Sequence, residues 1–111
     1  NEGEYNGQKI VSPDSIALMR QPHIQTGVLS KQVDGMGFGL GVGVVMDAEK
    51  TILIDRESDF FWSGFYGTNF FVSPQSGLVA VIMSQNQPPP ASPWPGSFGV
   101  FIAPAFGFLG I

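Results

Sequence analysis

The stretch "FFWSGFYGTNFFVSP", residues 60–74, combines the clearest strand signal of the chain with an unusual interruption. Its Phe, Trp, Tyr and Val side chains favour a β-strand, because aromatic and β-branched residues pack well on a pleated surface. Trp62-Ser63-Gly64 stands inside this run, and a glycine within a strand marks a bend or a close approach of another group to the backbone. The sequence therefore predicts one strand whose middle needs a separate explanation.

Flanking stretches predict further strands that pair with this one. Residues 78–85, "LVAVIMSQ", form a continuous apolar run, which is typical of a strand buried on both faces. Residues 35–47 alternate glycine with apolar residues, which predicts a strand with one bare face against which something packs closely. These glycines do not fit the G-x-G-x-x-G dinucleotide fingerprint, and no helix start follows them. A short strand is expected at residues 51–54.

The N-terminal part of the chain carries turn and helix signals. Asn6-Gly7 predicts a turn. Ser12 followed by Pro13 predicts a helix start, with Ser12 as the N-cap and proline at the first helical position. Pro22 is expected to end this helix.

Together these signals predict an α+β fold in a single segment, residues 1–111. We expect an antiparallel sheet of about three to four strands, preceded by a helix, because short turns join successive strands. A proline-rich connector, residues 86–96, leads to an apolar tail that we expect to form a weak helix on the sheet.

Composition excludes several classes of function. The chain has 111 residues, of which 43% are hydrophobic and 13% charged, so much of its surface is expected to be covered. A net charge of −4 with singly placed Lys and Arg argues against a nucleic-acid partner. The absence of cysteine excludes thiolate metal sites and cysteine nucleophiles. Pro104 and several glycines break the apolar tail, so no membrane span is expected.

No complete catalytic apparatus is visible in the residues themselves. His23 is the single histidine and is expected to be solvated or to cap a helix. Asp55, Glu57 and Asp59 are expected to form a solvated turn, and neither a metal nor a cofactor is predicted. The Ser-x-x-Lys nucleophile motif is absent. A pair of carboxylates acting on a glycoside stays open, because any two acids can meet in space.

Three segments, in order, resemble one known group of enzymes. These are "NEGEYNGQKIVSPDSIALM" (1–19), "GMGFGLGV" (35–42) and "WSGFYGTNFFVSPQSGLVAVIMSQ" (62–85). They are similar to the C-terminal part of the serine β-lactamase-like hydrolases, which include class C β-lactamases, penicillin-binding DD-peptidases and related esterases. The resemblance runs from about residue 3 to residue 86. Ser73 stands where the family usually has Asp, at a turn.

The resemblance implies a partial active site. Of the family's three motifs only the last, Lys-Thr-Gly, can be carried over, with Trp62 at the Lys position, Ser63 at the Thr position and Gly64 at the Gly position. It implies that these three residues bind substrate and that the Phe65 backbone N–H donates to the oxyanion. Gly64 would let substrate lie close to the backbone. Trp62 resembles the esterase branch, and its lack of a cation favours neutral esters over anionic β-lactams.

The same resemblance implies that the chain is the C-terminal part of a longer enzyme. Its partner would be the N-terminal part of that enzyme, which carries Ser-x-x-Lys and Tyr-x-Asn, and this chain alone would be inactive. The substrate would be a small acyl ester or amide. Two alternatives stay open: a β-lactam or D-amino-acid peptide hydrolase, and a non-catalytic β-rich interaction domain. The family favours a periplasmic or secreted location, which the sequence itself leaves undecided.

Overall fold

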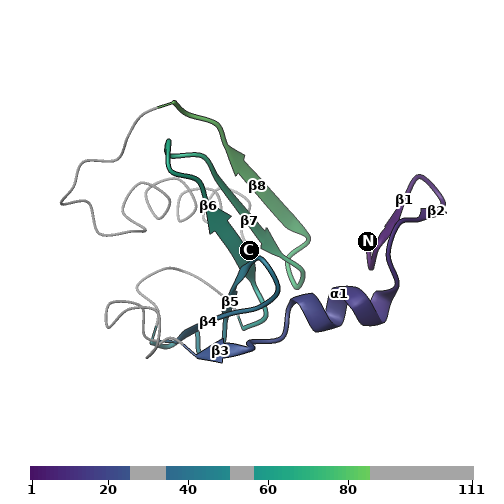
Figure 1. Cartoon of the computed structure of the whole chain (residues 1–111), viewed down its shortest axis with the longest axis horizontal. Coiled ribbons are helices and arrows are strands. Elements are labelled where there is room, and N and C mark those ends of the chain that lie inside the picture. The colour runs from purple at the N-terminus through teal and green to yellow at the C-terminus, as the bar shows by residue number, and fades with distance from the viewer. Residues whose placement is uncertain (26–34, 51–56, 86–111) are drawn as a thin grey trace.

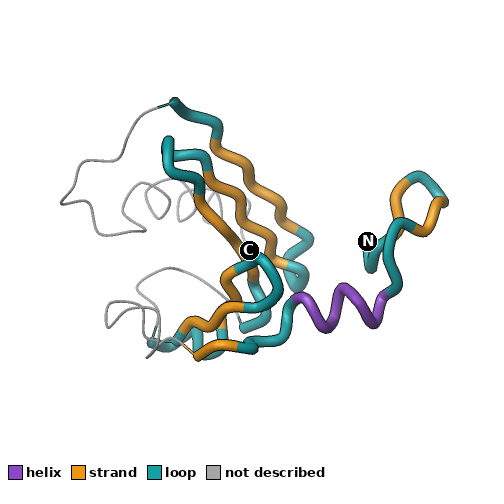
Figure 2. The backbone as a smooth tube through the Cα atoms, in the orientation of Figure 1, coloured by secondary structure: helices purple, strands orange, loops and turns teal. Residues whose placement is uncertain are grey.

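The structure, a computed structural model, describes residues 1–25, 35–50 and 57–85. These residues form a two-stranded hairpin, a short helix and a six-stranded antiparallel sheet whose strands neighbour one another in chain order (Figures 1 and 2). The hairpin pairs β1 (Glu4–Tyr5) with β2 (Gln8–Lys9), and the helix is α1 (Pro13–Met19). The sheet consists of β3 (Ile24–Gln25), β4 (Met36–Phe38), β5 (Gly43–Val45), β6 (Phe60–Ser63), β7 (Asn69–Ser73) and β8 (Leu78–Ile82).

The α+β class with an antiparallel sheet after a helix is confirmed, and the sheet has more strands than the three to four expected. The single strand predicted over residues 35–47 is in fact a hairpin of β4 and β5. Gly39 N–H donates to the Val42 carbonyl at 2.8 Å, and Gly41 has a φ of 87°. A left-handed φ suits glycine, so the same alternating glycines that look like a strand also permit a tight turn.

The glycines of this hairpin make room for the chain's own side chains. A Cβ on Gly43 would lie 2.7 Å from the Phe61 ring, and one on Gly37 would lie 2.7 Å from the Pro22 Cβ. At Gly39 the added atom would collide with the backbone carbonyl of Met19, the last residue of α1. Close packing against these glycines is therefore confirmed, and the groups that cover them come from within the chain. One bare glycine face is wrong, because the hairpin register places Gly37 and Gly43 on opposite faces of the sheet.

Both ends of α1 carry the caps that the sequence suggested. Ser15 N–H donates to the Ser12 hydroxyl at 3.1 Å, which satisfies one free donor of the first turn. His23 Nε2 lies 2.9 Å from the Leu18 carbonyl oxygen, so the histidine caps the C-terminal end of the helix. The prediction of a capping histidine is confirmed.

The predicted turn at Asn6-Gly7 is also confirmed. These residues connect β1 and β2 as a two-residue loop, with φ of 50° and 75°. Positive φ at both positions is what a type I′ hairpin turn requires, and it explains the Asn-Gly pair.

The sheet has two faces of different character. We call the face that carries the core the inner face; its core cluster is Met36, Val45, Phe61 and Phe71, with Ala48, Leu78, Ala80 and Ile82 packed against it. The opposite, outer face of the last three strands carries Phe60, Trp62, Phe70, Val72, Val79 and Val81, which share a face because of the strand registers.

The prediction that residues 78–85 are buried on both faces is wrong. Val79 and Val81 are 64% and 62% exposed, and β8 is the last strand of the described sheet. The run is apolar on both sides, yet none of the described residues covers its outer side.

Among the described residues no helix is long and apolar enough to cross a membrane. The strand expected at 51–54, the connector at 86–96 and the apolar tail lie outside the described residues.

Candidate functional site

The connection between β6 and β7 explains the interruption at Trp62-Ser63-Gly64. The single strand expected over residues 60–74 is in fact two strands joined by a tight turn. Gly67 N–H donates to the Gly64 carbonyl at 3.0 Å, and Gly64 N–H donates to the Thr68 carbonyl at 2.7 Å. Gly67 has a φ of 82°, whereas the two residues before it have negative φ. This is a type I turn followed by a left-handed glycine, a common three-residue hairpin loop.

Trp62 and Ser63 occupy the last two positions of β6, immediately before this turn. The Trp62 side chain is 44% exposed and meets the Phe38 ring edge to face at 4.7 Å between centroids. Ser63 pairs with Asn69 at the end of the ladder between β6 and β7. Both residues therefore lie at the end of β6 that leads into the turn. Their role in binding substrate stays a prediction.

Gly64 has a structural reason for lacking a side chain. A Cβ at this position would collide with the Thr68 hydroxyl, which lies across the turn. The volume expected to admit substrate is therefore occupied in part by Thr68. Access over Gly64 stays a prediction, and packing against Thr68 is sufficient by itself to explain glycine here.

Phe65 is the first central residue of the turn. Its side chain is 68% exposed, and its ring meets the Tyr66 ring edge to face. In a type I turn the N–H of this residue takes no part in the turn hydrogen bond. Within the described part of the chain the Phe65 N–H makes no hydrogen bond.

The side of β6 on which this N–H lies is unpaired among the described residues. Backbone groups of successive residues in a strand point alternately to its two neighbours. Gly64 N–H points to β7, so the backbone groups of Ser63 and Phe65 point towards the β5 side. The register between β5 and β6 ends at Phe61, so no described strand pairs with Ser63 or Phe65 there. Within residues 35–50 and 57–85 this edge therefore has no strand partner.

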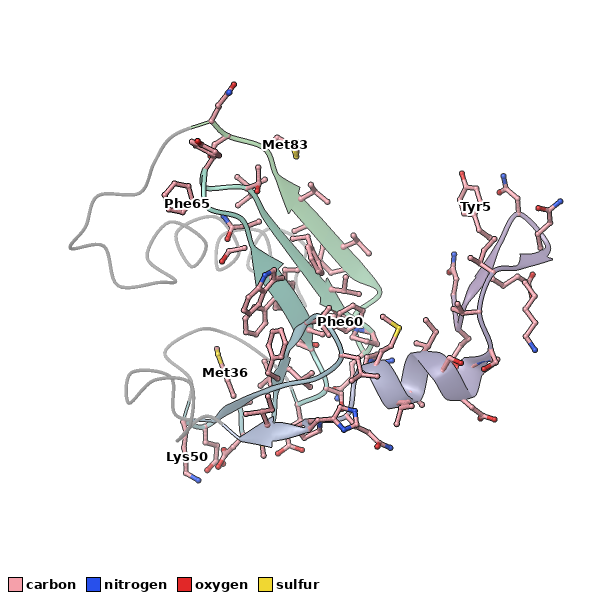
Figure 3. The ribbon with its side chains drawn as sticks, viewed as in Figure 1. Tyr5, Met36, Lys50, Phe60, Phe65 and Met83 are labelled. Carbon is pink, nitrogen blue, oxygen red and sulfur yellow. The ribbon has the colours of Figure 1, made fainter. Side chains whose placement is uncertain are left out.

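A groove of about 300 Å³ adjoins the same end of the sheet on β6, β7 and β8. It is lined by Trp62, Ser63, Gly64, Thr68, Asn69, Phe70, Val81 and Met83. Phe65 and Met83 lie at this end of the molecule (Figure 3). The three residues predicted to bind substrate therefore do lie together at one groove. The other five were not predicted, because their contribution depends on strand register and no sequence motif marks it.

None of the described residues that line this groove is charged. Among the described residues no cluster of three or more His, Asp or Glu could hold a metal. The Lys50 ammonium, 2.7 Å from Asp47, lowers the pKa of that carboxyl, and Lys50 lies at the opposite end of the sheet from Phe65 (Figure 3).

The solvated turn predicted around Asp59 is wrong for that residue, which is fully buried. Asp59 directly precedes β6 in the position opposite Ser73, on the inner face.

Comparison with known proteins relates this sheet to a hydrolase. No family model matches the sequence. The solved structure of EstCE1, described as a hydrolase with promiscuous acyltransferase activity, is similar over 73% of this chain, with 32% sequence identity and a TM-score of 0.65. That match covers 21% of the EstCE1 chain.

Two curated relatives come from strains of Mycobacterium tuberculosis. Uncharacterized protein MT1414 and Protein Rv1367c are each 28% identical over 96 residues, which cover 78% of this chain and 24% of the relative. The chain thus spans about a quarter of the length of these relatives and about a fifth of EstCE1. Its sheet is related to part of a larger hydrolase domain.

Proposed function

We propose that this chain forms one wall of the acyl-transfer site of a serine hydrolase of the β-lactamase-like group, acting on esters. The observation that carries the proposal is the Phe65 N–H, which makes no hydrogen bond among the described residues. It follows Trp62-Ser63-Gly64 at the end of a strand, in a sheet similar to that of EstCE1. A main-chain donor on a rigid hairpin is suited to bind an oxyanion, because it needs no reorganisation when charge develops.

The proposed reaction passes through an acyl-enzyme. A serine oxygen attacks the ester carbonyl carbon, and the carbonyl oxygen becomes an oxyanion that accepts a hydrogen bond from the Phe65 N–H. The C–O bond to the alcohol breaks as the alcohol takes a proton, and water later releases the acid. The attacking serine and its base would come from the N-terminal part of the same enzyme, so this chain alone would be inactive.

The side chain at position 62 supports esters as the substrate class. Trp62 presents an aromatic face and an indole N–H, whereas a lysine would present a cation to a substrate carboxylate. The groove beside it has Trp62, Phe70, Val81 and Met83 in its lining. A neutral ester fits these surroundings better than an anionic β-lactam, which is the second candidate.

The outer face of β8 supports the proposed partner. Val79, Val81 and Met83 are 64%, 62% and 79% exposed, and together they make an apolar strip beside an unpaired strand edge of the described sheet. Such a strip is costly to leave in water and marks an interface. Because the chain spans only 24% of its curated relatives, we assign this face to the N-terminal part of the enzyme.

The test uses the full-length protein that contains this chain, alongside the chain by itself. The full-length protein should hydrolyse p-nitrophenyl butyrate faster than the β-lactam nitrocefin, and a fluorophosphonate should label one serine upstream of this chain. The isolated chain should not be labelled. If nitrocefin is the better substrate, β-lactam hydrolysis replaces ester hydrolysis. A full-length protein that is neither labelled nor active supports the interaction domain and overturns the proposal.

A further inference from the structure

Two side chains outside the predicted motif hold the turn that carries Phe65. The Ser84 hydroxyl, just beyond β8, donates to the Tyr66 carbonyl at 2.9 Å. The Asn69 side-chain amide donates to the Gly67 carbonyl at 2.8 Å, and Asn69 is 8% exposed. Two consecutive carbonyls of the turn are therefore bound by side chains from β7 and from the end of β8.

The Ser84 bond differs in kind from the other hydrogen bonds of this turn. The bonds of Gly64, Gly67 and Asn69 are local to the hairpin, and they fix its shape. Ser84 is 18 residues away from Tyr66 in sequence, and it connects the tip of the turn to a third strand. It therefore limits the rocking of the whole turn relative to the sheet, which local bonds cannot do.

We propose that Ser84 is a positioning residue that sets the direction of the Phe65 N–H through the Tyr66 carbonyl. The inference rests on the proposed function of Phe65 as an oxyanion donor. The Phe65 N–H and the Tyr66 carbonyl lie on adjacent residues at the centre of one turn, so a hydrogen bond on the second restricts the first. A donor serves the transition state only when it is held within a narrow range of positions, because the oxyanion forms at one place.

This role predicts an effect on the chemical step and little effect on substrate binding. Ser84→Ala in the full-length protein should lower kcat for p-nitrophenyl butyrate about fivefold, the ratio that corresponds to one ordinary hydrogen bond. KM should stay within about twofold, because the ground-state carbonyl uses the oxyanion donor weakly. Affinity for an alkyl boronic acid, which mimics the tetrahedral intermediate, should fall in parallel with kcat. Ser84→Thr keeps the hydroxyl and should restore most of both.

Gln75 provides a matched control. Its side-chain amide donates to the Glu57 carbonyl at 3.1 Å across the same sequence separation of 18 residues, and it lies in the turn between β7 and β8, at the other end of these strands. Gln75→Ala should leave kcat and boronate affinity unchanged. If Gln75→Ala and Ser84→Ala lower kcat equally, the effect is one of general stability and the proposal is wrong.

A double-mutant cycle separates positioning from any independent role. Phe65→Pro removes the donor that Ser84 is proposed to position, so Ser84→Ala should have no further effect on kcat in that background. Additive losses would overturn the proposal while leaving Phe65 as the donor. If the wild-type protein is inactive and unlabelled, the proposed function is wrong. If the wild-type protein is active and Ser84→Ala leaves kcat unchanged, only the inference about Ser84 is wrong.

Discussion

Phe65→Pro isolates the backbone N–H on which the proposed chemistry depends. Proline has no N–H, and its fixed φ suits the first central position of a type I turn, which is where Phe65 lies. The substitution breaks no hydrogen bond among the described residues, because the Phe65 N–H has none there. It removes a side chain that is 68% exposed and contacts the Tyr66 ring. We therefore expect the free energy of unfolding to change by less than about 1 kcal/mol.

The expected loss of activity is much larger than this change in stability. Removing one oxyanion donor costs about 3 kcal/mol of transition-state stabilisation, so kcat should fall by about 10²-fold to 10³-fold. The assay is steady-state hydrolysis of p-nitrophenyl butyrate by the full-length protein, with the melting temperature measured in parallel. Phe65→Ala is the control, because it removes the same aromatic ring and retains the N–H. Its kcat should stay within about threefold of wild type.

Two results would refute this reasoning. If Phe65→Pro keeps most of the wild-type kcat, the Phe65 N–H is not an oxyanion donor. If Phe65→Ala and Phe65→Pro lose kcat equally, the aromatic side chain matters and the backbone does not. A large fall in the melting temperature of Phe65→Pro would instead contradict the type I turn, because proline fits that turn without strain.

Three further predictions concern neighbouring residues. Trp62→Lys introduces a cation beside the groove and should raise kcat/KM for nitrocefin relative to p-nitrophenyl butyrate by roughly tenfold. An unchanged ratio would show that the side chain at position 62 does not select substrates by their charge. Gly64→Ala should destabilise the protein through the collision with the Thr68 hydroxyl, by about 1–3 kcal/mol in urea unfolding, and Thr68→Ala in the same chain should restore much of the loss; no rescue would place the strain elsewhere. Phe71→Ala empties the centre of the inner face, where Phe71 is 1% exposed, and should cost about 3–5 kcal/mol, whereas Val79→Ala on the outer face should cost less unless another part of the enzyme covers it.

The sequence predicts the local features well, because each depends on residues that are neighbours in the chain. Ser12 and Pro13 start α1, and Asn6-Gly7 turns the first hairpin, as their side-chain and backbone chemistry requires. The antiparallel α+β class follows from strands separated by short turns. The grouping of Trp62, Ser63 and Gly64 at one groove follows from their adjacency at the end of one strand.

The tertiary structure decides the features that depend on register and on contacts between distant residues. Periodicity alone does not distinguish a glycine-rich strand from the hairpin of β4 and β5, because glycine permits both backbone conformations. Trp62-Ser63-Gly64 leads out of β6 into a turn instead of interrupting one strand. The hydrogen bond from Ser84 to the Tyr66 carbonyl exists only once β6, β7 and β8 are paired. The register between β5 and β6 likewise decides that no described strand pairs with the edge beside Phe65. Sequence determines what each segment can form, and the packing of distant strands selects which backbone groups remain free to bind a ligand.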